Sequence, residues 1–156
     1  MSHFTRHLGL RLLEYSDGRP VTRGDGCLWY LPEPLPWEVG AEGSGVFLTV
    51  PSFDPAGWSD ADLRALVRRD LRPRGVTDLT SVPWIARRLI RPDGPYVKGA
   101  VLHDDGYVTR GWDGAYTRKQ VDDVLSEALL SLGVAAWKRA AIYSAVRMGG
   151  AGGWGT

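Results

Sequence analysis

Hydrophobic positions in the second half of the chain recur at the spacing of α-helices. One apolar face is predicted between Thr117, a suitable N-cap, and Gly133, a suitable end, and consists of Val121, Val124, Leu125, Ala128, Leu129 and Leu132. Further helices are predicted over 97–108, where Gly106 and Gly111 should end or fray the helix, and over 134–148. The pattern therefore predicts a helical C-terminal half.

The first half of the chain shows short extended runs. Leu, Val, Phe and Tyr are concentrated in the runs 8–15, 28–31 and 45–50, which Gly, Asp and Pro clusters separate. Prolines interrupt the stretch after the second run, at Pro32, Pro34 and Pro36, so we expect an edge strand or a loop there. One small antiparallel sheet is the predicted arrangement.

A further helix is predicted from Ser59, which can cap it, to about Asp70. Asp60 and Asp62 suit the positive N-terminal end of that helix. A polar loop over 77–83 then leads into a short helix near Pro83. Together these elements predict an α+β fold, with a small N-terminal antiparallel β-sheet packed on a C-terminal bundle of about three to four helices.

Composition narrows the classes of function. The 156 residues suit a single domain over 1–156, and the formal net charge of +1 gives no reason to expect a nucleic-acid partner. Cys27 stands alone, which excludes an internal disulfide framework. No run has the length of a transmembrane segment, and the N-terminus lacks the apolar core of a signal peptide. If the protein leaves a cell, we expect lysis or a virion to carry it.

Candidate chemistry is concentrated on the predicted helix 97–108. On a helical wheel Ala100, His103, Asp104 and Tyr107 share an arc about 100° wide, from which Asp105 points away. Histidine titrates near neutrality, so His103 is the candidate general base that activates water. The alternative is a core histidine that makes one hydrogen bond.

Asp104 is the candidate metal ligand, because a side chain adjacent to His103 on one helix diverges from it. A hard cation such as Ca²⁺ prefers carboxylate and carbonyl oxygens, and the loop 78–83 could supply them, with Asp78 as the second candidate ligand. The alternative is a structural turn in which Asp78, Thr80 and Ser81 cap backbone amides.

Asp122 is the candidate partner that orients the imidazole of His103, with Tyr107 and Tyr143 holding its carboxylate. On the wheel Asp122 leans inward and Asp123 faces water; the alternative is that Asp122 is an ordinary surface residue near a helix N-terminus. Arg139, Tyr143 and Arg147 repeat at i, i+4 and i+8, a stripe that either meets a phosphate or carboxylate or is simply solvated.

Four motifs in order resemble the domain of unknown function 1353 family, whose members are typical of bacteriophages, prophages and phage-derived particles. They are Thr77-Asp-Leu-Thr-Ser-Val-Pro83, His103-Asp104-x-x-Tyr107, Arg118-Lys-x-x-Asp122 and Tyr143-x-Ala-Val-Arg147-x-Gly149. The resemblance spans about 45–150 and implies that 52–75 is an insertion with its own helix. It divides the chain into a mainly β part (1–51), that insertion, a helical motif-bearing part (76–150) and a Gly-rich tail (151–156).

A more distant resemblance links the His-Asp-x-x-Tyr helix and its following Asp-bearing helix to the helix pair of phospholipase A2. That resemblance implies that His103 activates water, that Asp104 binds calcium with carbonyls near 78–83, and that Asp122, supported by Tyr107, is the partner of His103. The chain departs from it in lacking the disulfides that join those helices and a Gly-rich calcium loop, with Arg87 and Arg88 in that region.

Two functions of different class follow from these patterns. The first is a phage-associated, phospholipase A2-like hydrolase of an ester or acyl bond, with a lipid or acyl-ester substrate. The second is a non-catalytic component of a virion or tail-like particle, made in the host cytoplasm, which contacts other particle proteins through the segment 31–37 and Trp154. A lysis-stage envelope factor is a third reading. The enzyme requires His103, Asp104 and Asp122 to converge in an open pocket, whereas the particle component predicts that the cluster is closed.

Overall fold

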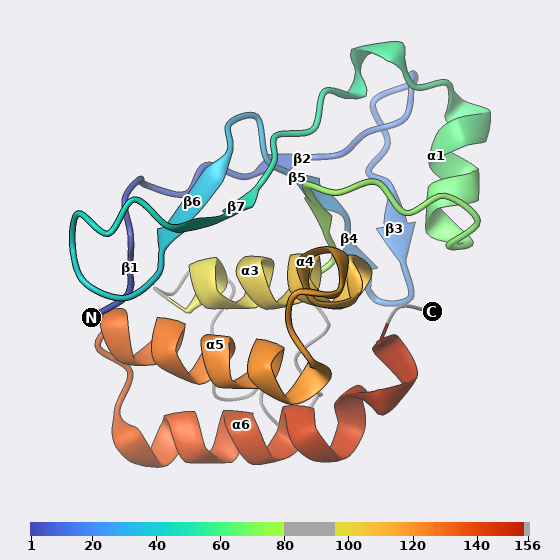
Figure 1. Ribbon diagram of the computed structural model, residues 1–156. Helices are drawn as coiled ribbons and strands as arrows, with labels where there is room; N and C mark the ends of the chain where they lie inside the picture. The colour runs from blue at the N-terminus through green and yellow to red at the C-terminus, as the bar shows by residue number, and fades with distance from the viewer. Residues whose placement is uncertain (80–95, 155–156) are drawn as a thin grey trace.

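The computed structural model describes residues 1–79 and 96–154 and has an α+β fold, as the sequence predicts. Strands and one helix occupy the N-terminal half, and helices stack in layers below them in Figure 1. The predicted short helix near Pro83 lies outside the described residues, as do Thr80, Ser81, Arg87 and Arg88.

The strands are short and form three antiparallel sheets among the described residues, so the prediction of a single sheet is wrong. The first sheet has the order β1-β6-β7, with β1 at His3–Phe4, β6 at Leu35–Glu38 and β7 at Phe47–Val50. The second has the order β2-β5-β8, with β2 at Arg11–Leu12, β5 at Trp29–Tyr30 and β8 at Val76–Thr77. The third pairs β3, Thr22–Arg23, with β4, Gly26–Cys27.

The proline-rich stretch forms a central strand, β6, where the sequence predicts an edge strand or a loop. Pro36 is paired with Thr49 in β7, and its carbonyl accepts a hydrogen bond from the amide of Thr5. Proline lacks only the N–H group, so its carbonyl still serves the sheet. The burial of Leu35 and Trp37 on the helices favours this strand despite the prolines.

The helices begin where the sequence places their caps. In α1, Asp60–Val67, Ser59 and Asp62 form a reciprocal capping box, and in α5, Arg118–Ser131, Thr117 and Gln120 do the same. Helix α1 ends three residues before the predicted Asp70. Helix α6 spans Ala136–Gly149. Short 3₁₀ turns lie before α1, at Pro55–Gly57, and directly after α6, at Gly150–Gly153.

Helix α3, Val97–Val108, has the predicted bounds but contains Gly106, which does not end it. It runs antiparallel to α5, and α5 runs antiparallel to α6 (Figure 1). Helix α5 lies between the other two and contacts both. The segment after α3, α4 at Arg110–Gly114, is a tight turn with left-handed backbone angles at Gly111, Trp112 and Asp113.

The apolar core has three clusters, which together position the polar residues of α3. One lies between the first sheet and α3, a second joins α3, α5 and α6, and the third packs α1 against the N-terminal strands. Asp105 of α3 is directed to the sheet side, where Arg74 binds both of its oxygens at 2.9 and 2.7 Å and also the carbonyl of Thr49. None of the described helices is long and apolar enough to cross a membrane.

Candidate functional site

Three donors from two helices converge on the carboxylate of Asp122 in α5. His103 Nε2 lies 2.8 Å from Oδ1, and the Tyr107 hydroxyl donates to the same oxygen at 2.8 Å. Arg147 of α6 donates from Nη1 to Oδ2 at 2.7 Å. His103 and Tyr107 are four residues apart on α3, so both lean toward α5 from one helical face.

These contacts fix the charge of Asp122, whose side chain is fully buried. Burial by itself raises the pKa of that carboxyl, but the hydrogen bonds from His103, Arg147 and Tyr107 outweigh it and hold the pKa below its usual value. Burial and the hydrogen bond to Asp122 raise the pKa of the Tyr107 hydroxyl, which therefore remains a donor. The pair His103–Asp122 is thus an oriented imidazole beside an ionised carboxylate.

The second ring nitrogen of His103 is free to accept. Because Asp122 is an acceptor, Nε2 carries the proton that points to it, and this tautomer leaves a lone pair on Nδ1. Nδ1 is buried and has no hydrogen-bond partner among the described residues. An oriented imidazole with an open nitrogen is what general-base chemistry needs. The side chain of His103 is nevertheless only 1% exposed.

Asp104 does not contact that pair and is held by β8 instead. Its Oδ2 accepts a hydrogen bond of 2.6 Å from the hydroxyl of Thr77 in β8, and the same hydroxyl accepts from the amide of Leu79. Its Oδ1 is buried without a partner among the described residues. Burial, with a further contribution from the charge of Asp78, raises the pKa of Asp104 well above its usual value.

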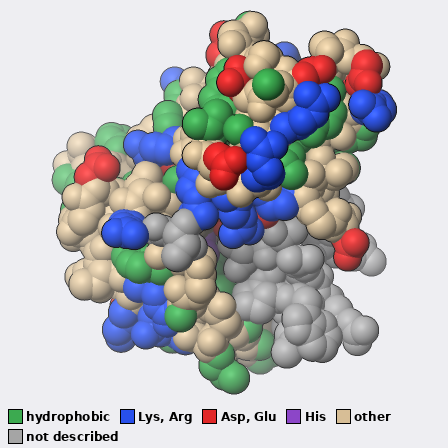
Figure 2. Space-filling model, turned by 90° about the vertical axis from the view of Figure 1, so that its right-hand side faces the viewer, with side chains coloured by type: hydrophobic (Ala, Val, Ile, Leu, Met, Phe, Trp, Pro, Cys, Tyr) green, Lys and Arg blue, Asp and Glu red, His purple; other side chains and the backbone are tan. Residues whose placement is uncertain are grey.

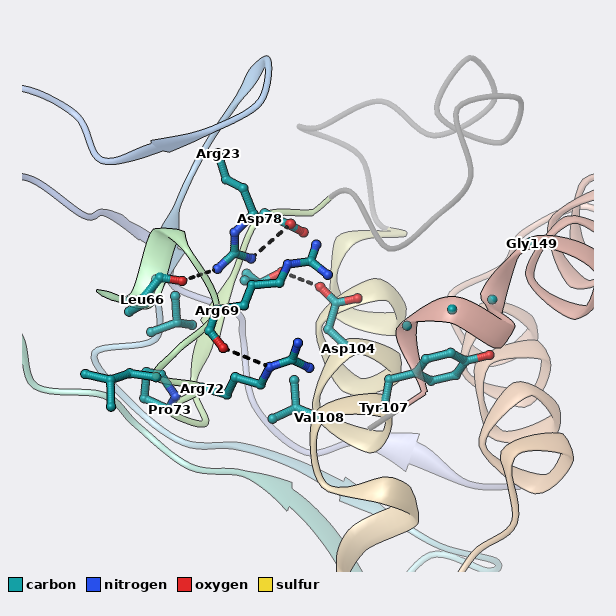
Figure 3. Close-up of a pocket in the computed structure, with 16 residues that line it drawn as sticks. Arg23, Leu66, Arg69, Arg72, Pro73, Asp78, Asp104, Tyr107, Val108 and Gly149 are labelled. Atoms are coloured by element: carbon teal, nitrogen blue, oxygen red, sulfur yellow. Dashed lines mark hydrogen bonds and ion pairs between the residues drawn. The ribbon is translucent and has the colours of Figure 1, made fainter. Parts of the chain in front are cut away.

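A cavity of about 360 Å³ opens beside Asp104 (Figure 3). Asp104 and Tyr107 line it from α3, Thr77 from β8 and Asp78 from the position after it, and Gly149 and Gly150 from the end of α6 and the turn that follows. His103 and Asp122 do not line it. The structure therefore brings His103, Tyr107 and Asp122 together, and brings Asp104 near Asp78. Of the first group only Tyr107 lines the cavity.

The described residues do not make a calcium site. Among them no group of three or more His, Cys, Asp or Glu side chains could hold a metal ion. Of the two expected ligands, Asp78 forms an ion pair of 3.4 Å with Arg23, and guanidinium groups line the same cavity. Calcium requires six to eight oxygen ligands, so these two carboxylates beside cations are insufficient.

Tyr143 contacts Asp123 and not Asp122, the carboxylate that the sequence analysis expected it to hold. Tyr143 donates to Asp123 at 2.7 Å, where Lys119 also binds, and it is Arg147 that holds Asp122. Asp123 is half-exposed, so the prediction that it faces water is confirmed only in part. The i, i+4, i+8 spacing on α6 left open whether the stripe meets a phosphate or carboxylate or is solvated, and the structure shows that Arg147 meets a carboxylate.

The cationic lining of the cavity was not expected from the sequence. The cavity is lined by Arg23, Arg69 and Arg72, which lie far apart in the chain and in segments without a shared motif. Trp154 packs edge-on against the ring of Tyr107 at a centroid distance of 5.2 Å, so the Gly-rich tail covers the end of the cluster.

Comparisons with known proteins bear on the same part of the chain. A search of curated proteins and a search of solved structures gave no match. The family described as "Protein of unknown function (DUF1353)" matches residues 69–146, half of the chain, which include Asp104, His103, Asp122 and the helices that carry them. The chain therefore belongs to the DUF1353 family.

Proposed function

We propose that the protein is a hydrolase of an ester or acyl bond in which His103 activates water. The observation that carries the proposal is the buried His103–Asp122 pair, with Nε2 held at 2.8 Å and Nδ1 left without a partner among the described residues. The carboxylate that orients His103 is itself held in place by two further side chains, the arrangement of a base and its orienting partner.

The proposed step is a hydrolysis in which His103 moves one proton. Nδ1 takes a proton from water as the water oxygen bonds to the acyl carbon. The tetrahedral intermediate then collapses, the bond from the acyl carbon to the leaving oxygen breaks, and Nδ1 returns the proton to that oxygen. The ionised Asp122 stabilises the imidazolium formed in between, and Arg147 and Tyr107 keep the carboxylate in position.

Access is the structural requirement of this proposal. Tyr107 contacts both the cavity and Asp122, and its ring lies 4.3 Å from that of His103. The proposal therefore requires that the Tyr107 ring is displaced, so that a substrate in the cavity reaches His103.

The test is hydrolysis of short-chain p-nitrophenyl esters and of phospholipid vesicles by the wild type, His103→Gln and Asp123→Asn. We expect His103→Gln to lose about 100-fold or more in kcat/KM. Asp123→Asn, a change of the neighbouring and half-exposed carboxylate, should leave the rate unchanged. Equal rates in His103→Gln and the wild type, with both shown by circular dichroism to be folded, would exclude His103 as the base.

The calcium ligand role of Asp104 stays a prediction with its own measurement. Calorimetric titration of calcium into the wild type and Asp104→Asn would show saturable binding that the variant loses. Absence of binding at millimolar calcium would leave a hydrolase whose His103 works without that ion.

A second candidate is a non-catalytic component of a phage virion or tail-like particle, made in the host cytoplasm. The closed position of His103, 1% exposed, favours it, and so do exposed apolar side chains on α5 and α6, Leu130, Trp137 and Met148. Within the contact segments first expected, Trp37 is fully buried and Trp154 packs on Tyr107, whereas Glu33 and Pro34 are exposed. Phage association rests on the resemblance of the motifs.

Particle purification separates the two candidates. A structural component should sediment with intact particles after lysis of the host, at a constant number of copies for each particle. An inactive wild type that co-sediments in this way would favour the particle component, and an active protein that stays in the supernatant would favour the hydrolase.

A further inference from the structure

The cavity beside Asp104 carries more positive charge than its own carboxylates neutralise. Arg23, Arg69 and Arg72 line it together with Asp78 and Asp104. Arg23 is fixed, since it donates to the carbonyls of Leu66 and Val67 and pairs with Asp78. Figure 2 shows Lys and Arg side chains gathered on this face of the molecule, the right-hand side of Figure 1.

Arg69 and Arg72 have no ion-pair partner among the described residues. They follow α1, and both direct their guanidinium groups across the cavity toward α3, Arg69 toward Asp104 and Arg72 toward Val108 (Figure 3). Arg72 Nε donates to the carbonyl of Arg69 at 3.4 Å, a contact within the turn that follows α1. Like charges placed together in this way favour an anionic ligand that contacts both.

The backbone at Arg69 gives an independent reason to look for a role of this side chain. Its φ angle is +64°, in the left-handed region, at the position after the end of α1 where glycine is the favoured residue. A residue with a side chain lowers the stability of the folded state at such a position, whereas glycine does not. Backbone strain of this kind is concentrated at binding and active sites.

The rest of the cavity wall is apolar or backbone. Leu66, Pro73, Val76 and Val108 contribute apolar surface, and Gly149, Gly150, Gly152 and Gly153 bring main chain close on the opposite side. A volume of about 360 Å³ is at the small end of the range of ligand pockets and exceeds the needs of a single anion.

We propose that this cavity binds a phosphate monoester with an apolar substituent, the phosphate between Arg69 and Arg72 and the substituent against Val76 and Val108. Two planar guanidinium groups can each form paired hydrogen bonds with the oxygens of a dianionic phosphate. The inference does not depend on hydrolysis by His103, because it concerns the charge and shape of the cavity alone.

The experiment is calorimetric titration of the full chain at constant ionic strength with inorganic phosphate, hexyl phosphate and hexylammonium. We expect one phosphate site, and hexyl phosphate bound at least about tenfold more tightly, since each buried methylene adds to the binding. Hexylammonium should not bind. The proposal would be overturned if phosphate showed no saturable binding, or if hexyl phosphate and hexylammonium bound equally. If hexyl phosphate bound no more tightly than phosphate, the apolar part of the proposal would be wrong.

Three variants test whether binding takes place in this cavity. Arg72→Gln and Arg69→Gly should each weaken the binding of hexyl phosphate by about tenfold or more. Arg11→Gln, the same loss of charge on an exposed residue that does not line the cavity, should bind as the wild type does. Arg69→Gly should in addition unfold at a temperature no lower than the wild type, so that weaker binding cannot be ascribed to a damaged fold. Wild-type affinity in both cavity variants would refute the site.

Discussion

At the scale of single residues, the carboxylate of Asp122 shows how much one buried charge depends on its neighbours. It accepts from His103, Tyr107 and Arg147, while the adjacent Asp123 has Tyr143 and Lys119 and is half-exposed. Removal of one partner from a buried and satisfied charge network costs far more than removal of one from an exposed pair.

Asp122→Asn should therefore lower the free energy of unfolding at neutral pH by about 3 kcal/mol. Asp123→Asn, its matched control, should lower the free energy of unfolding by less than about 1 kcal/mol. Urea denaturation followed by circular dichroism measures both. Equal effects of the two changes would show that burial of Asp122 does not hold in solution.

The same carboxylate predicts a dependence on pH. The folded state lowers the pKa of Asp122, so its contribution is fully present above the unfolded-state pKa of about 3.9 and is lost as pH falls through the lower folded value. The difference in stability between the wild type and Asp122→Asn should accordingly shrink as acid is added below about pH 4. A difference that is constant between pH 7 and pH 3 would contradict the lowered pKa.

At the scale of elements, the close approach of α3 to α5 depends on a glycine. A Cβ atom at Gly106 would lie 2.6 Å from Val121 Cγ1 and 2.9 Å from an atom of the Trp112 ring. At Gly99, on the same helix, the nearest atom would be at the ordinary distance of 3.4 Å, from Leu129. The packing of the helix pair that holds His103 against Asp122 thus tolerates an added methyl group at one position and not at the other.

We expect Gly106→Ala to destabilise the protein by about 1–3 kcal/mol, because the added methyl group overpacks the contact with α5. Gly99→Ala should be neutral or stabilise by up to about 1 kcal/mol, because alanine favours helices over glycine. Thermal unfolding of the two variants measures the contrast. A stabilising Gly106→Ala would mean that α3 and α5 lie farther apart than described.

At the scale of the whole molecule, Arg74 ties the β half to the helices. It binds the carboxylate of Asp105 in α3 and the carbonyl of Thr49 in β7, and the indole of Trp112 donates to the same carboxylate at 3.1 Å. The side chain of Asp105 is 2% exposed, so loss of Arg74 would leave a buried charge with one donor.

Arg74→Met should lower the free energy of unfolding by about 2 kcal/mol, less than for a fully buried pair because Arg74 is itself 38% exposed. Addition of Asp105→Asn should recover part of the loss, with a coupling energy of about 1 kcal/mol or more in a double-mutant cycle. Additive effects of the two changes would show that the ion pair carries no stability.

The sequence by itself determined the local structure of the helical half and the choice of chemistry-bearing residues. Helical periodicity, the caps Ser59 and Thr117, and the shared face of His103 and Tyr107 are properties of neighbouring residues, and they need no knowledge of distant ones. The structure confirms these elements, and it places Asp122 beside His103 as the wheel of α5 suggested.

Tertiary structure decided the rest, because the forces involved join residues that are distant in the chain. Burial of Leu35 and Trp37 favoured a central strand in a proline-rich stretch. The packing of α6 placed Arg147 against Asp122 and Tyr143 against Asp123. The arginine-lined cavity arises where the end of α1, β3 and the C-terminal turn meet. Such a meeting has no sequence period, so only the packed molecule reveals it.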